Sequence, residues 1–341
     1  MNINDFLTTS DFIGFREFIP RNRDEYLQYA QISYNLKLNT SVPTTVHIEP
    51  TNICNQQCCM CSYPDMKRDK KNIDDILAYK AIDECAALGV YAVHFFFFGE
   101  PFANKKTLGF MKYAKQKNIP IVSVTTNGAL LTDEDLISLI DAGIDSIHFS
   151  FEGISREKYQ QIRGKDDFDT VKENIHKLLQ YKKQFISSKP WVALTYARTN
   201  ESNEEIEAFI ESWKNLVNDI HISPQLDNYG RTAIGREKSK INSGGLLDRN
   251  IQNRLPCRQL WMRLCVLSNG ELVPCAQNID GELSLGNLKD MTIAEAWKSQ
   301  KLRRLRARHI MNTLDEELVC KNCIDWDWSG KVDNRPSLKK D

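Results

Sequence analysis

From residue 44 to about residue 224, short apolar runs alternate with stretches in which apolar residues recur at helical spacing. Short apolar runs predict β-strands, and stretches with an apolar residue at every third or fourth position predict amphipathic helices. The predicted strands lie at 46–50, 91–98, 119–125, 146–151, 191–196 and 219–223. The predicted helices lie at 73–87, 104–116, from Asp133 onward, 155–163, 168–184 and 202–216. Strands that alternate with helices in this way indicate an α/β fold with a parallel sheet.

Strands of a parallel sheet are usually buried on both faces, so their sequences are continuously apolar. Four consecutive phenylalanines at 95–98 fit this pattern, and we interpret them as core packing. In parallel barrels the chemistry gathers at the carboxyl ends of the strands. Candidate functional residues are therefore sought just after each predicted strand.

The pattern also divides the chain. Residues 1–43 are predicted to be a helical lead-in, 44–224 the α/β domain, 225–253 a linker, 254–330 a Cys-rich domain, and 331–341 a polar tail. We expect the sheet to end near residue 224. In the Cys-rich part, Asn269 and Gly270 predict a hairpin turn between strands at 264–267 and 271–274. One helix is predicted at 290–305.

Composition narrows the function. The chain has 341 residues, 45 basic and 45 acidic, and a formal net charge of zero, which argues against a nucleic-acid partner. No apolar run is long enough to cross a membrane, and no secretory signal is visible, so the cytoplasm is the expected compartment. The ten cysteines indicate metal or redox chemistry in such a compartment.

Three cysteines follow the first predicted strand with the spacing Cys54-x3-Cys58-x2-Cys61. Three thiolates on one loop can hold three irons of a cubane cluster and leave the fourth iron open to a small-molecule ligand. The other interpretation is a structural zinc site, which usually has four ligands. Cys59 is the available fourth thiol, although its adjacency to Cys58 makes that geometry awkward.

This spacing after a first strand resembles the signature of the radical S-adenosylmethionine (SAM) superfamily. The resemblance covers residues 44 to about 224 and implies a partial (β/α)6 barrel, a [4Fe–4S] cluster on the three cysteines, and SAM as the cofactor. Shorter motifs agree with those of the family and imply that the following residues bind the cofactor: Gly99, Glu100, Pro101, Asn127, Ser150, Glu152, Arg163 and Arg198.

The match to the family motifs has three departures. Met60 stands where relatives usually have an aromatic residue before the third cysteine. Phe98 replaces the first glycine of a Gly-Gly-Glu-Pro-like motif, and Glu152 replaces the aspartate of a Ser-x-Asp-Gly-like motif. These substitutions predict that the contacts to SAM are partly redrawn.

A second group of cysteines lies near the other end of the chain, at Cys257, Cys275, Cys320 and Cys323. Four thiolates can enclose either zinc or a fully ligated iron–sulfur cluster, and spacing alone does not choose between them. The pattern resembles the twitch domain of radical SAM enzymes, a shortened SPASM domain. That resemblance implies one auxiliary [4Fe–4S] cluster on these four residues.

The resemblance also sets the functional expectations. Related aminocyclitol enzymes imply a small-molecule substrate such as a sugar, aminocyclitol or other polyol, which is oxidised or epimerised. Cys265 is left over and is either a buried hydrophobe or, by analogy with radical SAM epimerases, a hydrogen-atom donor. A peptide-modifying maturase is the alternative enzyme, and a non-catalytic metal protein is the alternative of another class. The expected electron donor is a flavodoxin or ferredoxin.

Overall fold

The fold was analysed in a computed structural model, which describes residues 41–199, 201–224, 256–314, 318–321 and 323. The predicted linker at 225–253 and the tail at 331–341 lie outside the described residues, as does the lead-in up to residue 40. None of the described helices is long and apolar enough to span a membrane.

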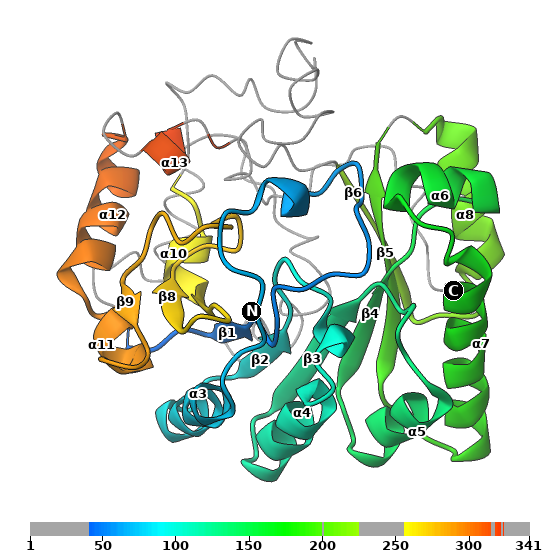
Figure 1. Cartoon of the computed structure of the whole chain (residues 1–341), viewed down its shortest axis with the longest axis horizontal. Coiled ribbons are helices and arrows are strands. Elements are labelled where there is room, and N and C mark those ends of the chain that lie inside the picture. The colour runs from blue at the N-terminus through cyan, green and yellow to red at the C-terminus, as the bar shows by residue number, and fades with distance from the viewer. Residues whose placement is uncertain (1–40, 200, 225–255, 315–317, 322, 324–341) are drawn as a thin grey trace, which may run out of the picture.

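The predicted α/β fold is confirmed. Six strands and the helices between them alternate along the chain, and all six strands run parallel in the order β6-β5-β4-β3-β2-β1 (Figure 1). The strands are β1 (Thr45–Ile48), β2 (Ala92–Phe95), β3 (Ile121–Thr126), β4 (Ser146–Ser150), β5 (Trp191–Arg198) and β6 (Asp219–Pro224). The helices are α3 (Asp75–Leu88), α4 (Thr107–Gln116), α5 (Asp133–Asp141), α6 (Arg156–Arg163), α7 (Phe168–Gln184) and α8 (Asn203–Trp213), with short 3-10 turns η1 (Tyr63–Asp65) and η2 (Pro101–Ala103).

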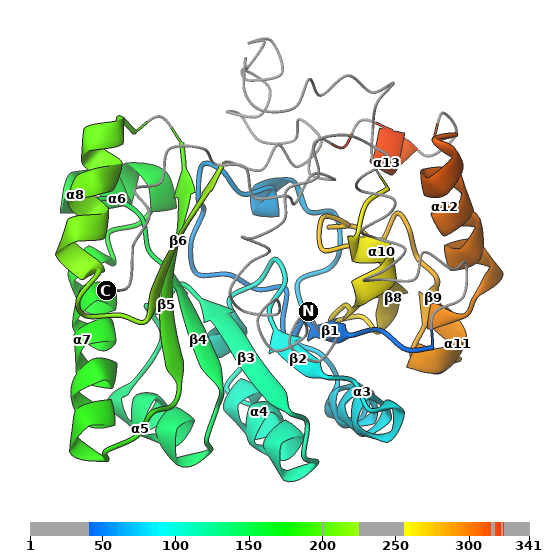
Figure 2. The same cartoon turned by 180° about the vertical axis from the view of Figure 1, so that it is seen from behind.

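The sheet is curved, and the helices lie outside it (Figures 1 and 2). Strand side chains alternate between the two faces. Val46 and Ile48 of β1 and Val93 of β2 belong to the main hydrophobic core and are fully buried. Their neighbours His47 and His94 point to the opposite, concave face and line a cavity. The space between sheet and helices is therefore apolar, whereas the concave face carries polar side chains among apolar ones.

The sheet continues beyond residue 224, which corrects the expectation that it ends there. Strand β7 (Arg263–Val266) pairs in parallel with β1, so that His47 is opposite Cys265. β8 (Glu271–Val273) and β9 (Gly286–Asn287) then extend the sheet in antiparallel pairs to nine strands. The predicted hairpin between β7 and β8 is confirmed, and the Cys-rich segment thus closes one side of the barrel.

The single helix predicted at 290–305 is wrong, because the chain forms two helices there. Thr292 and Glu295 form a capping box that starts α11 (Ile293–Trp297), and Ser299 caps a new helix, α12 (Gln300–Met311). A serine at an N-cap satisfies the free N–H of Leu302, so a helix start at this point is stabilised. The short helices α10 (Gln259–Met262) and α13 (Leu318–Lys321) complete the described part.

Candidate active site

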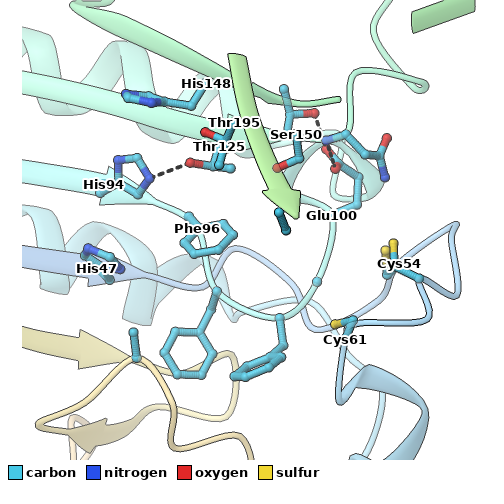
Figure 3. Close-up of a pocket in the computed structure, with 18 of the residues that line it drawn as sticks. His47, Cys54, Cys61, His94, Phe96, Glu100, Thr125, His148, Ser150 and Thr195 are labelled. Atoms are coloured by element: carbon cyan, nitrogen blue, oxygen red, sulfur yellow. Dashed lines mark hydrogen bonds between the residues drawn. The ribbon is translucent and has the colours of Figure 1, made fainter. Parts of the chain in front are cut away.

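One cavity of about 590 Å³ occupies the concave side of the barrel and reaches from the first cysteine group to the start of β7 (Figure 3). Its size is that of a typical small-molecule site. Most of the sequence-predicted site residues of the barrel line it: Cys54, Cys58, Cys61, Gly99, Glu100, Asn127, Ser150, Glu152 and Arg163. The structure therefore brings together at one edge of the sheet residues from five separate motifs.

The cysteine loop is held in shape by hydrogen bonds from its neighbours. The Cys54 N–H donates to Tyr63 Oη at 2.9 Å, and the Cys61 N–H donates to the Cys58 carbonyl at 3.0 Å. Asn52 bridges the two arms of the loop, because its amide donates to the Asp69 carbonyl and accepts from the Lys71 N–H. These bonds fix the backbone that carries the three thiols.

The three thiols fit an iron–sulfur cluster better than one zinc ion. In the described part of the chain, no three Cys, His, Asp or Glu side chains lie close enough to ligate a single metal ion. Burial raises the pKa of the Cys54 thiol to about 11 and that of Cys61 to about 12. A bound cation is needed to keep such buried thiols ionised. Cys59 is exposed and does not line the cavity, so the structure does not favour it as a fourth ligand.

Gly99 and Glu100 join the end of β2 to its neighbours. A Cβ on Gly99 would lie 2.1 Å from the Thr51 carbonyl oxygen, so only glycine allows the segment after β2 to approach the backbone just before Cys54 this closely. The Glu100 carboxylate is buried and accepts hydrogen bonds from Thr126 Oγ1 at 2.6 Å and from the Asn127 N–H at 2.7 Å. Its oxygens are thus engaged by β3, and the backbone around it is left to face the cavity.

Asn127 and Ser150 end two further strands at the same edge. The Asn127 side-chain amide donates to Asn55 Oδ1 at 2.7 Å, which ties the end of β3 to the cysteine loop. Ser150 is half-buried and lines the cavity, as does Met60 beside the third cysteine. Met60 thus offers a soft apolar side chain to the cavity at the position where relatives usually have an aromatic residue.

Glu152 and Arg163 form a buried ion pair at the cavity wall. The Arg163 guanidinium also donates to Cys58 Sγ at 3.5 Å. Burial raises the pKa of Glu152, and the neighbouring Arg163 opposes that shift. The pair therefore places a fixed positive charge against one of the proposed cluster ligands, and the larger Glu in place of Asp reaches that arginine.

Two of the predicted cofactor residues lie outside the residues that line the cavity. Pro101 is buried at the start of η2, where its fixed φ suits the first position of a helical turn. Arg198 ends β5, and its guanidinium donates to the Glu201 carbonyl at 2.8 Å and to Asn203 Oδ1 at 2.9 Å. Direct contact of these two side chains with SAM stays a prediction.

The second cysteine group lies in the segment after β6. Cys257 and Cys320 are buried, and Cys275 and Cys323 are half-buried. The Cys257 N–H donates to His309 Nδ1 at 3.3 Å, and the Gln277 N–H donates to Cys275 Sγ at 3.3 Å. Burial lowers the pKa of Arg263 at the start of β7, and the nearby thiols, among them Cys257 and Cys275, oppose that shift. The group therefore adjoins the closed end of the barrel, and its common ligation of one cluster stays a prediction.

Cys265 faces the inside of the barrel but is covered. It is fully buried and packs with Phe97, Leu267 and Val273, and it is not among the residues that line the cavity. Burial raises the pKa of its thiol, so the S–H form is retained. That form is the one a hydrogen-atom donor needs, whereas the cover by Phe97 separates it from the cavity.

The polar residues inside the barrel were not predicted from the sequence. Four of the six histidines of the chain line the cavity, at His47, His94, His148 and His221. Arg263 lines it too, and so do three of the four consecutive phenylalanines, Phe96, Phe97 and Phe98. The interpretation of the phenylalanine run as core packing is therefore confirmed only in part: Phe95 belongs to the main core and Phe97 to a second hydrophobic cluster, whereas Phe96 and Phe98 are half-buried at the cavity. The available signal was the alternation in each strand, for example Val46-His47-Ile48.

Family models define the class of this protein. The Radical SAM superfamily model matches residues 48–212, and the model of an iron–sulfur cluster-binding domain, SPASM, matches residues 257–324. The chain belongs to the radical SAM superfamily and carries a C-terminal SPASM domain. Its cofactors are accordingly SAM, the [4Fe–4S] cluster that binds SAM, and auxiliary iron–sulfur ligation in the SPASM domain. As a radical SAM enzyme it also needs a reductant.

Two relatives show how far sequence similarity extends. The tungsten-containing aldehyde ferredoxin oxidoreductase cofactor-modifying protein of Pyrococcus furiosus is 23% identical over 292 residues, 75% of this chain and 81% of the relative. The GTP 3',8-cyclase of Chlorobaculum tepidum is 30% identical over 167 residues. That second match covers 49% of this chain and 48% of the cyclase, about half of each.

Solved structures share the fold. BtrN in complex with AdoMet and 2-DOIA is 16% identical with a TM-score of 0.58, over 84% of this chain and 94% of BtrN. Streptococcus suis SuiB bound to precursor peptide SuiA is 15% identical with a TM-score of 0.63, over 82% of this chain and 70% of SuiB. At such identities the likeness establishes the fold alone.

Proposed function

We propose that this radical SAM enzyme abstracts a hydrogen atom from a small polar substrate, a sugar, aminocyclitol or related polyol, and oxidises or epimerises it. The observation that carries the proposal is a band of hydrogen-bonding side chains on the inner surface of the barrel. Hydroxyl and imidazole groups on six strands line it: Thr45, His47, His94, Ser123, Thr125, His148, Ser150, Thr195 and His221. A hydroxyl-rich substrate can both donate to and accept from such groups.

The imidazoles inside the barrel are suited to this task because they are neutral. Burial lowers the pKa of His94 well below its usual value and that of His148 to about 4. The two ring nitrogens of His94 already contact protein hydroxyls, Ser123 Oγ at 2.5 Å and Thr125 Oγ1 at 2.9 Å. Figure 3 shows the second of these contacts. Neutral rings held in this way orient hydroxyls without adding charge to the cavity.

The residues at the carboxyl edge would hold the cofactors. We propose Cys54, Cys58 and Cys61 as ligands of the SAM-binding cluster, and Asn127 and Ser150 as contacts for SAM. When both groups are bound, reductive cleavage of SAM supplies a 5′-deoxyadenosyl radical for hydrogen abstraction. The barrel wall keeps water away from the substrate, since the cavity lies between the sheet and the cysteine loop.

A peptide-modifying activity is the second candidate. Its support is the shared fold with SuiB, which was solved with its precursor peptide. The fold is shared equally with the 2-DOIA complex of BtrN, so it does not choose between the two. The hydroxyl and imidazole groups on that inner surface favour the small hydroxylated substrate.

The test uses anaerobically reconstituted enzyme with dithionite, SAM and two substrate panels, deuterated polyols and peptides. The expected result is formation of 5′-deoxyadenosine that carries deuterium from a polyol. Deuterium transfer from peptides alone would establish the second candidate. A fully loaded enzyme that forms no 5′-deoxyadenosine under any condition would exclude both. Flavodoxin or ferredoxin is proposed as the physiological donor and can replace dithionite in the same assay.

A further inference from the structure

Of the charged side chains that line the cavity, three have an ion-pair or hydrogen-bond partner within the described part of the chain and one has none there. They are Glu100, Glu152, Arg163 and Arg263. Glu152 and Arg163 form an ion pair with each other, and Glu100 accepts hydrogen bonds from η2 and from the end of β3. Among the described residues, no side chain or carbonyl accepts a hydrogen bond from the Arg263 guanidinium, and no carboxylate lies within ion-pair distance of it. It is the cavity's unmatched cation.

Arg263 lies at the end of the cavity opposite to the cysteine loop. In the sheet it is opposite Thr45, the first residue of β1, whereas the loop follows the last residue, Ile48. Strands rise about 3.3 Å per residue, so the two levels are roughly 10 Å apart. A molecule that touches both ends of the cavity is therefore about as long as a phosphorylated or carboxylated sugar.

His47 gives an independent indication of a ligand at that end. His47 lies on β1, two residues after Thr45, which is paired with Arg263 of β7. Burial lowers the pKa of His47, and the Arg263 guanidinium lowers it further. His47 is only 5% exposed, and its Nδ1 atom has no hydrogen-bond partner among the described residues. Buried polar atoms are rarely left unpaired, so a ligand group is the natural partner.

We propose that the substrate carries an anionic oxygen group, a carboxylate or a phosphate monoester, which binds Arg263 and His47 at the end of the cavity remote from the cysteine loop. The proposal rests on the proposed function and specifies its substrate class. A guanidinium matches the geometry of both anions, and the pairing offsets the cost of a half-buried charge without a carboxylate partner. The anion then fixes the substrate with its reacting carbon toward the SAM end.

The competing partner for Arg263 is the auxiliary cluster. Cys257 and Cys275, two of its proposed ligands, are close enough to Arg263 to affect its charge. If the guanidinium serves only to offset the charge of that cluster, substrate anions gain nothing from it. The experiment must therefore measure both anion binding and the potential of the auxiliary cluster.

The test is anaerobic calorimetry on the enzyme with both clusters and SAM bound. The probes are inorganic phosphate, acetate, glucose 6-phosphate, glucuronate and neutral glucose. We expect an anionic probe to bind more tightly than glucose and to bind about ten- to a hundredfold more weakly to Arg263→Met. Arg263→Lys should retain part of the affinity. The exposed Arg304→Met in α12 is the matched control and should bind as the wild type does.

The probes and readouts separate the outcomes. A preference for glucose 6-phosphate or for glucuronate assigns the phosphate or the carboxylate. The inference is overturned if no anion binds more tightly than glucose. It is also overturned if Arg263→Met shifts the midpoint potential of the auxiliary cluster without weakening any anion. Uncoupled SAM cleavage by the wild type, measured on the same sample, tests the proposed function separately.

Discussion

Glu49, just after β1, receives a two-point ion pair from Arg68, with N–O distances of 2.7 and 2.8 Å. Both side chains are almost completely buried. Arg68 also donates to the Ile279 carbonyl at 2.5 Å, and Glu49 accepts from the Ser268 N–H at 2.8 Å. The pair therefore joins the segment that follows the first cysteine group to the SPASM part of the chain.

The first prediction is that Arg68→Met strongly destabilises the enzyme. The substitution leaves the Glu49 carboxylate buried and unpaired, which typically costs about 3–5 kcal/mol. The measurement is the free energy of unfolding in urea. Lys106→Met removes an exposed ion pair with Asp75 and serves as the control, for which we expect no measurable change. Equal losses in both variants would contradict the structural role of the buried pair.

The second prediction concerns Arg163, whose guanidinium donates to Cys58 Sγ. A positive donor to a cluster sulfur stabilises the reduced cluster, so its removal should lower the midpoint potential. The double variant Arg163→Met/Glu152→Met avoids leaving a buried carboxylate unpaired. We expect a fall of tens of millivolts, since ~1 kcal/mol in a one-electron couple is roughly 40 mV. The measurement is a redox titration followed by electron paramagnetic resonance.

A control for that titration joins the helix of Arg163, α6, to the next helix, α7. Arg156 and Asp169 form an exposed ion pair, and neither residue lines the cavity. Arg156→Met/Asp169→Met should leave the potential unchanged. An unchanged potential in the Arg163 variant as well would mean that Arg163 positions Glu152 and does not tune the cluster.

Local sequence patterns predicted most of the fold. The strand and helix positions between 44 and 224 were correct to within a few residues, because each element has its own period and its own caps, such as the Thr132–Asp135 capping box of α5. The parallel pairing of β7 with β1 was not predictable in this way. It joins residues about 200 positions apart, and the apolar sequence of β7 is compatible with several partners.

The site residues that belong to sequence motifs were predicted. Those that are marked only by the alternation of polar and apolar residues along a strand were not. The spacing of Cys54, Cys58 and Cys61 identified the edge of the barrel directly. His47 and His94 were missed because strands buried on both faces were expected to be wholly apolar. A barrel that encloses a polar ligand breaks this rule on its inner face. The isolated polar residue in Val46-His47-Ile48 was the sign of it.

The third prediction tests Cys265 as the hydrogen-atom donor for epimerisation. Its S–H is retained by burial, so it can return a hydrogen atom to a substrate radical once Phe97 moves aside. We expect Cys265→Ala to form 5′-deoxyadenosine but to lose the inverted product, as followed by chromatography in D2O. Cys85→Ala, a fully buried cysteine of α3, is the control. Wild-type product from Cys265→Ala would exclude the donor role.

The fourth prediction separates an auxiliary cluster from structural zinc. Two [4Fe–4S] clusters require about eight irons per chain, and Cys257→Ser should reduce the count to about four. The exposed Cys59 is not a proposed ligand, so Cys59→Ser should retain the full count. Iron, sulfide and zinc are measured on each reconstituted protein. About four irons with one zinc in the wild type would show that the second site is structural.

The fifth prediction follows from the neutral histidines inside the barrel. Burial lowers the pKa of His148 to about 4 from its usual 6.5, so below pH 6.5 the unfolded chain binds a proton that the folded chain does not. Stability is therefore complete above about pH 6.5 and declines toward pH 4, by about 3 kcal/mol for this residue. His148→Gln should flatten that decline, whereas His176→Gln, at an exposed position on α7, should change it much less. Urea unfolding at pH 7.5, 6 and 5 measures the difference from the wild type at each pH, which cancels effects common to all three proteins. A wild-type pH dependence in His148→Gln would show that this imidazole is as accessible to protons in the folded enzyme as in the unfolded chain.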